Sequence, residues 1–155
     1  MALGTCVLLV GGVYAYVKWK SAENEPEGGF VNMPNPMVEC KSSEDFAKYG
    51  LTLKTPANAT DVSYYMIAGQ IAEIKCVIGG KEYCFRAAKD SDYQSLSGVY
   101  GDWIRSDRSS KAEYYQIKGD PEYHVAGWTA EGITYCASTT ASEEDLAKAV
   151  EEYIK

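Results

Sequence analysis

Two adjacent glycines, Gly79-Gly80, constrain the fold of this chain more than any other feature. They separate two runs that are rich in β-branched and aromatic residues, Ile71–Ile78 and Lys81–Ala87. Because glycine readily adopts positive φ at both turn positions, the pair predicts a two-residue β-hairpin with Cys76 opposite Tyr83. Side chains on one face of such a hairpin alternate along each strand. The residues that we expect on the core face are Ile74, Cys76, Tyr83 and Phe85.

Strand patterns recur on both sides of this hairpin, and a capped helix is expected near each end of the domain. The other expected strands are 62–68, 113–118, 123–129 and 133–138. Ser42 can cap a short helix that ends at Gly50, and Ser142 can cap a longer helix that begins with three acidic residues. The sequence therefore predicts an α+β domain. We expect an antiparallel β-sheet of about five to six strands, with a short N-terminal and a longer C-terminal helix packed on one face.

An uncharged segment precedes this domain. Ala2–Val17 carries no charged side chain and is slightly shorter than the ~20 residues of a membrane-spanning helix. A signal anchor is our main interpretation, and a cleaved signal peptide with Val13-Tyr14-Ala15 at its cleavage site is the alternative. A lipoprotein segment ending at Cys6 or a buried core helix explains the pattern less well. Lys18 and Lys20 alone favour a cytoplasmic domain by the positive-inside tendency.

Three segments follow from this pattern. Residues 1–20 are the hydrophobic signal anchor or signal peptide, and residues 21–36 are a polar stretch with Gly and Pro that we expect to be a flexible linker. Residues 37–155 are the α+β domain. The expected location is the cell membrane, with a single pass through it, and secretion after signal cleavage is the alternative.

Composition excludes several classes of function. The formal net charge is -7, which argues against nucleic acid and against anionic lipid surfaces as partners. The cysteines show no CxxC spacing, so no zinc site and no other cofactor is expected. His124 is the single histidine, and a surface position explains it better than a catalytic pairing with a cysteine. We therefore expect no catalytic residues.

The polar segment between the predicted strands offers one candidate contact site. Tyr100, Trp103, Arg105 and Arg108 lie within it, and exposed aromatic and arginine side chains are typical of recognition surfaces. We predict that these four side chains contact a ligand or partner. The alternative is that Tyr100 and Trp103 only hold a long loop against the sheet.

Two cysteines are candidates for a disulfide. The hairpin register places Cys76 and Cys84 on opposite faces, so these two cannot pair with each other. Cys84 and Cys136 can share the other face, and a bridge between them is allowed outside the cytoplasm. The alternative is that both are small buried hydrophobic residues or free thiols.

The order of several short motifs resembles the bacterial domain-of-unknown-function family 4367. The motifs are Asn35-Pro36-Met37-Val38-Glu39, residues 67–74, the Gly79-Gly80 turn, Ser97-Gly98-Val99-Tyr100, Trp128–Gly132 and the acidic last helix. The resemblance implies a domain on the outer side of the membrane in Gram-positive bacteria, usually behind an N-terminal anchor. It implies no activity and no catalytic residues. Cys40, Cys76, Cys84 and Cys136 depart from the family pattern.

The functional expectation combines these features. We expect a membrane-anchored extracytoplasmic binding or sensing module, not an enzyme, whose partner is an unknown protein or envelope ligand. The alternatives are a cell-envelope enzyme that uses surface carboxylates and a structural protein-interaction domain.

Overall fold

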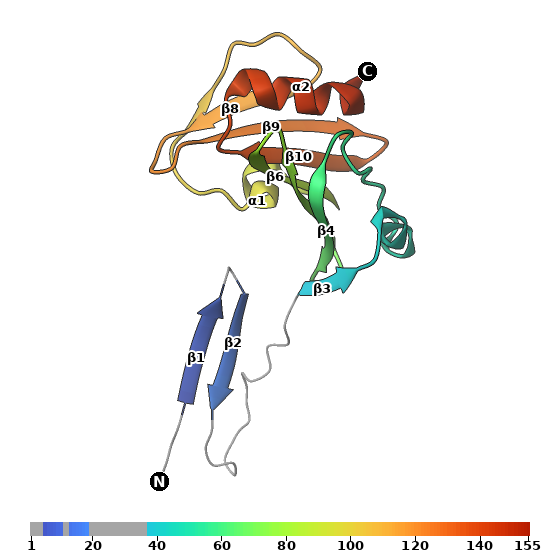
Figure 1. Cartoon of the computed structure of the whole chain (residues 1–155), viewed down its shortest axis with the longest axis vertical. Coiled ribbons are helices and arrows are strands. Elements are labelled where there is room, and N and C mark those ends of the chain that lie inside the picture. Colours follow the sequence, from blue (N-terminus) through green and yellow to red (C-terminus); the bar gives the residue numbers. More distant parts are fainter. Residues whose placement is uncertain (1–4, 11–12, 19–36) are drawn as a thin grey trace. The chain divides into compact units, whose positions relative to one another are not determined.

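The computed structural model describes residues 5–10, 13–18 and 37–155 (Figure 1). Strands β1 (Thr5–Val10) and β2 (Val13–Lys18) form an antiparallel hairpin, which belongs to a different compact unit from Glu39–Lys155. In the part of the chain that is described, no helix is long and apolar enough to cross a membrane. The expected linker, residues 21–36, lies outside the described residues. The signal anchor and signal peptide stay predictions.

The domain is built on a single sheet of eight strands. In spatial order the strands are β3 (Met37–Cys40), β4 (Thr60–Ile67), β5 (Ile71–Ile78), β6 (Lys81–Lys89), β10 (Ile133–Thr139), β9 (Tyr123–Ala130), β8 (Glu113–Ile117) and β7 (Trp103–Arg105). Neighbours from β4 to β7 pair antiparallel. The prediction of five to six strands was therefore wrong. The two strands that it lacked, β3 and β7, form the edges and are too short to show an alternating pattern.

The central hairpin has the predicted register. Gly79 and Gly80 adopt φ values of 59° and 81°, as a two-residue turn between right-twisted strands requires. Cys76 pairs with Tyr83, and both are buried in the main hydrophobic core. A second two-residue turn, Glu131-Gly132, joins β9 to β10 and also has positive φ at both positions, 52° and 81°. These two turns set which side chains face each side of the central strands.

The two expected helices pack on one face of the sheet, and an additional short helix packs on the other, which corrects the expectation that helices cover one face only. The long helix α2 (Glu143–Ile154) packs with Leu146 and Val150 on the face that carries Phe85, here called the α2 face. The short helix α1 (Tyr93–Ser97) packs with Leu96 on the opposite face, here called the α1 face, against Val125. The figure shows the two helices on either side of the central strands (Figure 1). A five-residue helix has no readable periodicity, so the sequence pattern did not reveal it.

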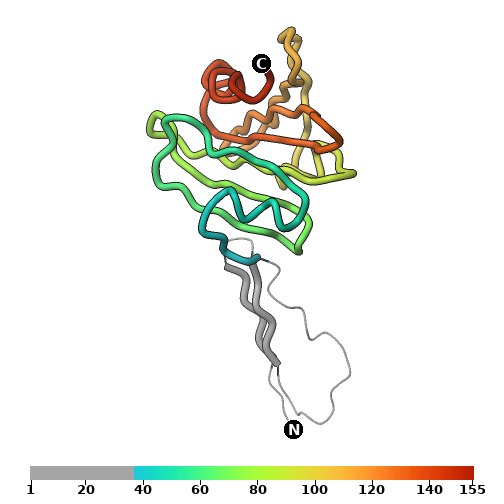
Figure 2. The backbone as a smooth tube through the Cα atoms, turned by 90° about the vertical axis from the view of Figure 1, so that its right-hand side faces the viewer, coloured from blue at the N-terminus to red at the C-terminus, as the bar shows by residue number. Residues whose placement is uncertain are grey.

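The N-terminal end of the domain completes the core of the α2 face. The short helix η2 (Ser43–Tyr49) is a 3-10 helix capped by Ser42 and ended by Gly50 in the left-handed conformation. Phe46, together with Leu51 and Leu53 after the helix, packs against buried residues of β4, β5 and β6. Figure 2 shows this segment alongside the strands that it covers. The capping residues predicted at Ser42 and Ser142 are confirmed.

A glycine allows α1 to approach the sheet closely. Gly127 in β9 lies directly under the ring of Tyr93, the first residue of α1. A β-carbon at this position would lie 2.5 Å from two ring carbons of Tyr93. Because backbone and ring cannot both stay in place at that distance, only glycine permits this packing.

We expect Gly127→Ala to destabilise the domain by about 1–3 kcal/mol, the usual cost of overpacking a well-filled site. Urea unfolding of the single variants and of the double variant Gly127→Ala/Tyr93→Ala measures the coupling between the two sites. Removing the ring relieves the clash, so the double variant should be more stable than the sum of the single losses predicts. Strictly additive losses would show that Tyr93 does not lie over Gly127.

Candidate functional site

A groove of ≈ 1220 Å³ opens on the α1 face, where α1 does not cover the sheet. Its floor consists of outward-facing side chains of three strands: Lys75 and Val77 of β5, Glu82 and Cys84 of β6, and Ser138 of β10. One wall is residues 97–100, which follow α1, and the other is residues 118–121, between β8 and β9. The groove is therefore formed by regular strands below and two loops above.

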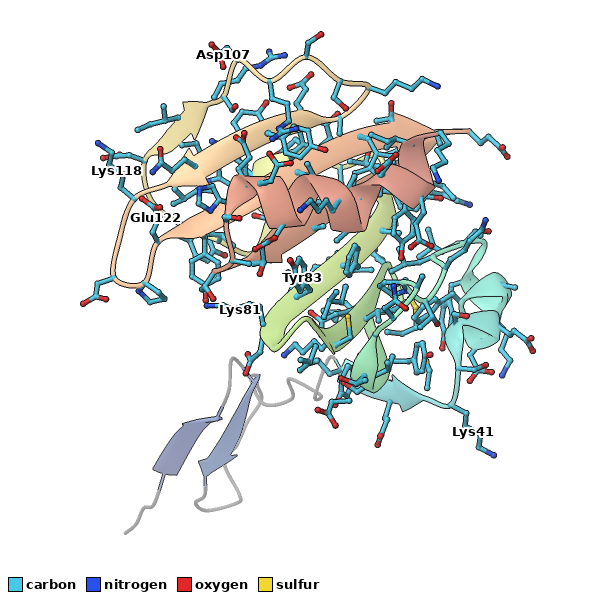
Figure 3. All side chains as sticks on the ribbon, turned by 45° about the horizontal axis from the view of Figure 1, so that its top comes forward. Lys41, Lys81, Tyr83, Asp107, Lys118 and Glu122 are labelled. Atoms are coloured by element: carbon cyan, nitrogen blue, oxygen red, sulfur yellow. The ribbon has the colours of Figure 1, made fainter. Side chains whose placement is uncertain are left out.

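Charged side chains of both signs surround the groove. The lysines are Lys75, Lys81 and Lys118, and the carboxylates are Asp61, Glu82 and Asp120. Lys81 at the start of β6 and Lys118 after β8 are both exposed, and both extend into solvent at this end of the sheet (Figure 3). Positive and negative groups are thus equal in number here, although the whole chain carries a net charge of -7.

The wall after α1 presents one fully exposed aromatic ring. Tyr100 is 89% exposed, the highest value among the large hydrophobic residues that the structure describes. The chain before it is held in place, because Val99 N–H donates to Ser97 Oγ at 3.0 Å and Trp103 Nε1 donates to the Val99 carbonyl at 3.3 Å. After it, Gly101 adopts φ 141° and leaves no room for a β-carbon beside Ile117. The loop thus holds Tyr100 at the rim of the groove.

A buried ion pair lies next to the floor. Glu73 of β5 is 0% exposed, and Arg86 of β6 donates to its Oε2 through Nε at 2.8 Å and lies 2.7 Å away through Nη2. The Cys84 thiol donates to the same oxygen at 3.4 Å. The other oxygen, Oε1, has no hydrogen-bond partner and lies 3.9 Å from the ammonium of Lys75. Hydrogen bonds from the protein therefore reach only one of the two carboxylate oxygens.

Arg86 also joins the ion pair to the wall of the groove. Its Nη1 donates to the carbonyl of Leu96, near the end of α1, at 3.0 Å. Gly98 packs directly on this guanidinium, because a β-carbon there would lie 2.6 Å from Nη1. One side chain thus positions both Glu73 beside the floor and the loop that carries Tyr100.

The thiols at this site are weak nucleophiles. Burial, reinforced by the Glu73 carboxylate, raises the pKa of Cys84 to about 12. Burial also raises the pKa of Cys136, which lies on the same face. Since the thiolate is the reactive species, both side chains are protonated and unreactive at neutral pH.

The structure separates the four predicted contact residues. Tyr100 lines the groove, whereas Trp103 is half-buried with its ring centroid 5.1 Å from that of Tyr115. Arg105 is exposed and lies 3.7 Å from a carboxylate oxygen of Glu113.

Arg108 faces the other side of the sheet. It forms ion pairs of 3.2 Å with Glu143 and Glu144 of α2 and lies over the ring of Tyr114. Trp103 and Arg108 therefore hold the long loop, and only Tyr100 belongs to the groove.

The cysteines and the histidine occupy the following positions. Cys84 and Cys136 share the α1 face in diagonal positions, since Cys136 pairs with Arg86 and Cys84 with Ser138, and both are free thiols. The Cys84–Cys136 bridge stays a prediction.

His124 lies on the α2 face, with Nδ1 2.9 Å from the Ala141 carbonyl. Within the described part of the chain, no three His, Cys, Asp or Glu side chains are grouped to hold a metal ion.

Sequence reasoning missed the ion pair although its signal was present. The register that places Cys76 opposite Tyr83 also places Glu73 opposite Arg86, and the structure has this pairing. An acid directly across from an arginine on interior strands indicates a buried pair. The groove could not be predicted in the same way, because its walls are loops, whose positions do not follow from strand register.

Comparison with known proteins gives no relative: no family model matches the chain, and neither a curated protein nor a solved structure matches it. The resemblance to family 4367 therefore stays a hypothesis from the sequence. The groove and the ion pair beside it are the features that bear on function.

We expect Arg86→Ala to destabilise the domain by about 3–5 kcal/mol, because it leaves the buried Glu73 carboxylate without its main partner. Arg105→Ala is the matched control, since its ion pair is exposed and is worth about 1 kcal/mol or less. Urea unfolding measures both.

Replacing both Glu73 and Arg86 by leucine should recover much of the loss, because no unpaired charge is then buried. If Arg86→Ala costs no more than Arg105→Ala, Glu73 does not depend on Arg86.

Proposed function

We propose that residues 37–155 form a binding or sensing module without a catalytic site, and that the module takes up a polar ligand in the groove. The groove carries this proposal: it combines a floor of interior strands, two loop walls and one exposed tyrosine at the rim. A concave site with several convergent polar groups is the usual form of a ligand-binding site.

The rest of the described surface supports recognition in the groove rather than on an apolar patch. The large hydrophobic residues with high exposure are Val38, Tyr49, Tyr100 and Ile104. They belong to β3, η2, the loop after α1 and β7, so they do not follow one another on a single element. A docking surface for a structural partner needs a contiguous apolar patch instead.

The groups in the groove support binding rather than catalysis. Cys76 and Cys84, the two thiols among its lining residues, are protonated at neutral pH because burial raises their pKa values to about 11 and about 12. His124 is the single imidazole of the chain, and it lies on the opposite face with Nδ1 engaged by the Ala141 carbonyl. A cysteine or serine of the groove therefore lacks an imidazole base.

We further propose that the module lies outside the cell membrane. The uncharged segment Ala2–Val17, the polar residues 21–36 and the resemblance to family 4367 support this location. In this location the groove would be exposed to ligands of the cell envelope that are absent from the cytoplasm.

A fragment screen by two-dimensional amide NMR tests the position of the site without knowledge of the natural ligand. Small polar fragments should shift amide signals of residues 97–100, 118–120 and 138–140, which line the groove. Thr140→Arg should abolish these shifts, because a long side chain then fills the groove. Thr129→Arg is the matched control, since Thr129 is also exposed but lies at the far end of β9. Fragment shifts that cluster elsewhere, or that survive Thr140→Arg, would show that the groove is not the binding site.

Labelling of intact cells with a membrane-impermeant amine reagent tests the location. Exposed lysines such as Lys41, Lys81 and Lys118 should be modified without lysis. Amines serve better than thiols here, because the raised pKa of Cys84 suppresses its labelling on either side of the membrane. Modification that requires lysis would place the module in the cytoplasm and contradict this part of the proposal.

A further inference from the structure

The charge balance of the groove selects against charged ligands. Three ammonium groups and three carboxylates line it, so a ligand with a net charge of either sign meets repulsive as well as attractive groups. An anion would in addition approach a chain with a net charge of -7. The balance therefore favours a neutral ligand.

The chemistry of the lining calls for a ligand with many donors and acceptors. Lysine ammonium groups donate and carboxylates accept, and the hydroxyls of Ser138 and Thr140 do both. A ligand that cannot hydrogen-bond would leave these groups desolvated and unpaired, at a cost that grows with each group. A polyhydroxylated molecule satisfies donors and acceptors at the same positions.

Tyr100 supplies the complementary apolar contact. Its ring is 89% exposed and is held at the rim by a loop fixed on both sides. A rigid tyrosine offers a large contact area at a small cost in conformational entropy. The negative face of its ring attracts the polarised C–H groups that line one side of a sugar ring.

The position of the groove on the sheet argues against peptides. An extended peptide binds a sheet by adding a strand at an exposed edge. The floor belongs to β5, β6 and β10, which are interior strands with neighbours on both sides. Phosphorylated and acidic peptides are recognised by arginine clusters, and the described lining of the groove contains no arginine.

The size of the groove favours an oligomer. Its volume of ≈ 1220 Å³ exceeds the roughly 300–1,000 Å³ typical of small-molecule sites. A single sugar unit would contact only a small part of the polar lining.

We propose that the groove binds a neutral oligosaccharide, with Tyr100 stacked on one sugar ring and the polar floor bonded to the hydroxyls of its neighbours. This inference rests on the proposed function and adds the class of ligand. Tyr100 then determines affinity by direct contact, whereas Arg86 acts at a distance by positioning its loop.

Amide NMR titrations with defined probes test this proposal. The neutral probes are cellohexaose, maltohexaose and chitohexaose, the anionic probe is a heparin-derived hexasaccharide, and the peptide probe is a neutral Ser/Thr-rich hexapeptide. At least one neutral oligosaccharide should shift residues of both groove walls, and the corresponding monosaccharide should bind more weakly. Tyr100→Ala should weaken this binding about tenfold, the loss expected for a stacking contact. Tyr49→Ala is the control, because Tyr49 is an exposed tyrosine of η2 that does not line the groove.

The outcomes separate the two proposals. Tighter binding of the peptide or the anionic probe in the groove would overturn the oligosaccharide assignment and leave the binding module standing. Equal oligosaccharide binding by Tyr100→Ala and the parent would also overturn it. If none of the probes shifts the groove and the fragment screen finds no site there, both proposals fail.

Discussion

The buried pair of Glu73 and Arg86 is the interaction on which the α1 face depends. A fully buried carboxylate is costly unless it is paired, so Glu73 requires Arg86 to stay in place. The same guanidinium donates to the Leu96 carbonyl and supports Gly98, so it holds α1 and the chain after it. The α2 face has no fully buried carboxylate among its described residues: its core is apolar packing around Phe85, Trp128 and Leu146, and the ion pairs of Arg108 with α2 are partly exposed. The two faces of one sheet therefore depend on different kinds of interaction.

The parts of the fold that follow from local chemistry were predictable from the sequence. Gly79-Gly80 requires a tight turn, and the turn determines the register between β5 and β6 from Ile78↔Lys81 to Ala72↔Ala87. The same holds for the end of η2 at Gly50 and for the cap at Ser142, where a single residue satisfies backbone groups that the helix leaves unpaired. These features depend on a few adjacent residues, and no distant contact changes them.

The parts that depend on contacts distant in sequence were not predictable. Strands of three and four residues, such as β7 and β3, form only because they hydrogen-bond to a longer neighbouring strand. The placement of α1 depends on the space above Gly127 and on the hydrogen bond from Arg86 to the Leu96 carbonyl. Neither contact leaves a recognisable pattern in the sequence of α1 itself. The candidate site shows the same division. Tyr100 was expected from its chemistry, but its separation from Trp103 and Arg108 depends on ring packing and on ion pairs with α2.

Arg86 links the stability of the fold to the shape of the proposed binding site. The groove wall is positioned by a side chain whose first role is to neutralise a buried charge, so the loop cannot move freely without disturbing the pair. A site held in this way loses little conformational entropy when a ligand binds, because its loop is already ordered. Such preorganisation suits a weakly interacting neutral ligand, which has no ion pair to offset an ordering cost. The buried pair thus provides the rigidity that the proposed recognition by hydroxyl contacts and a single aromatic ring requires.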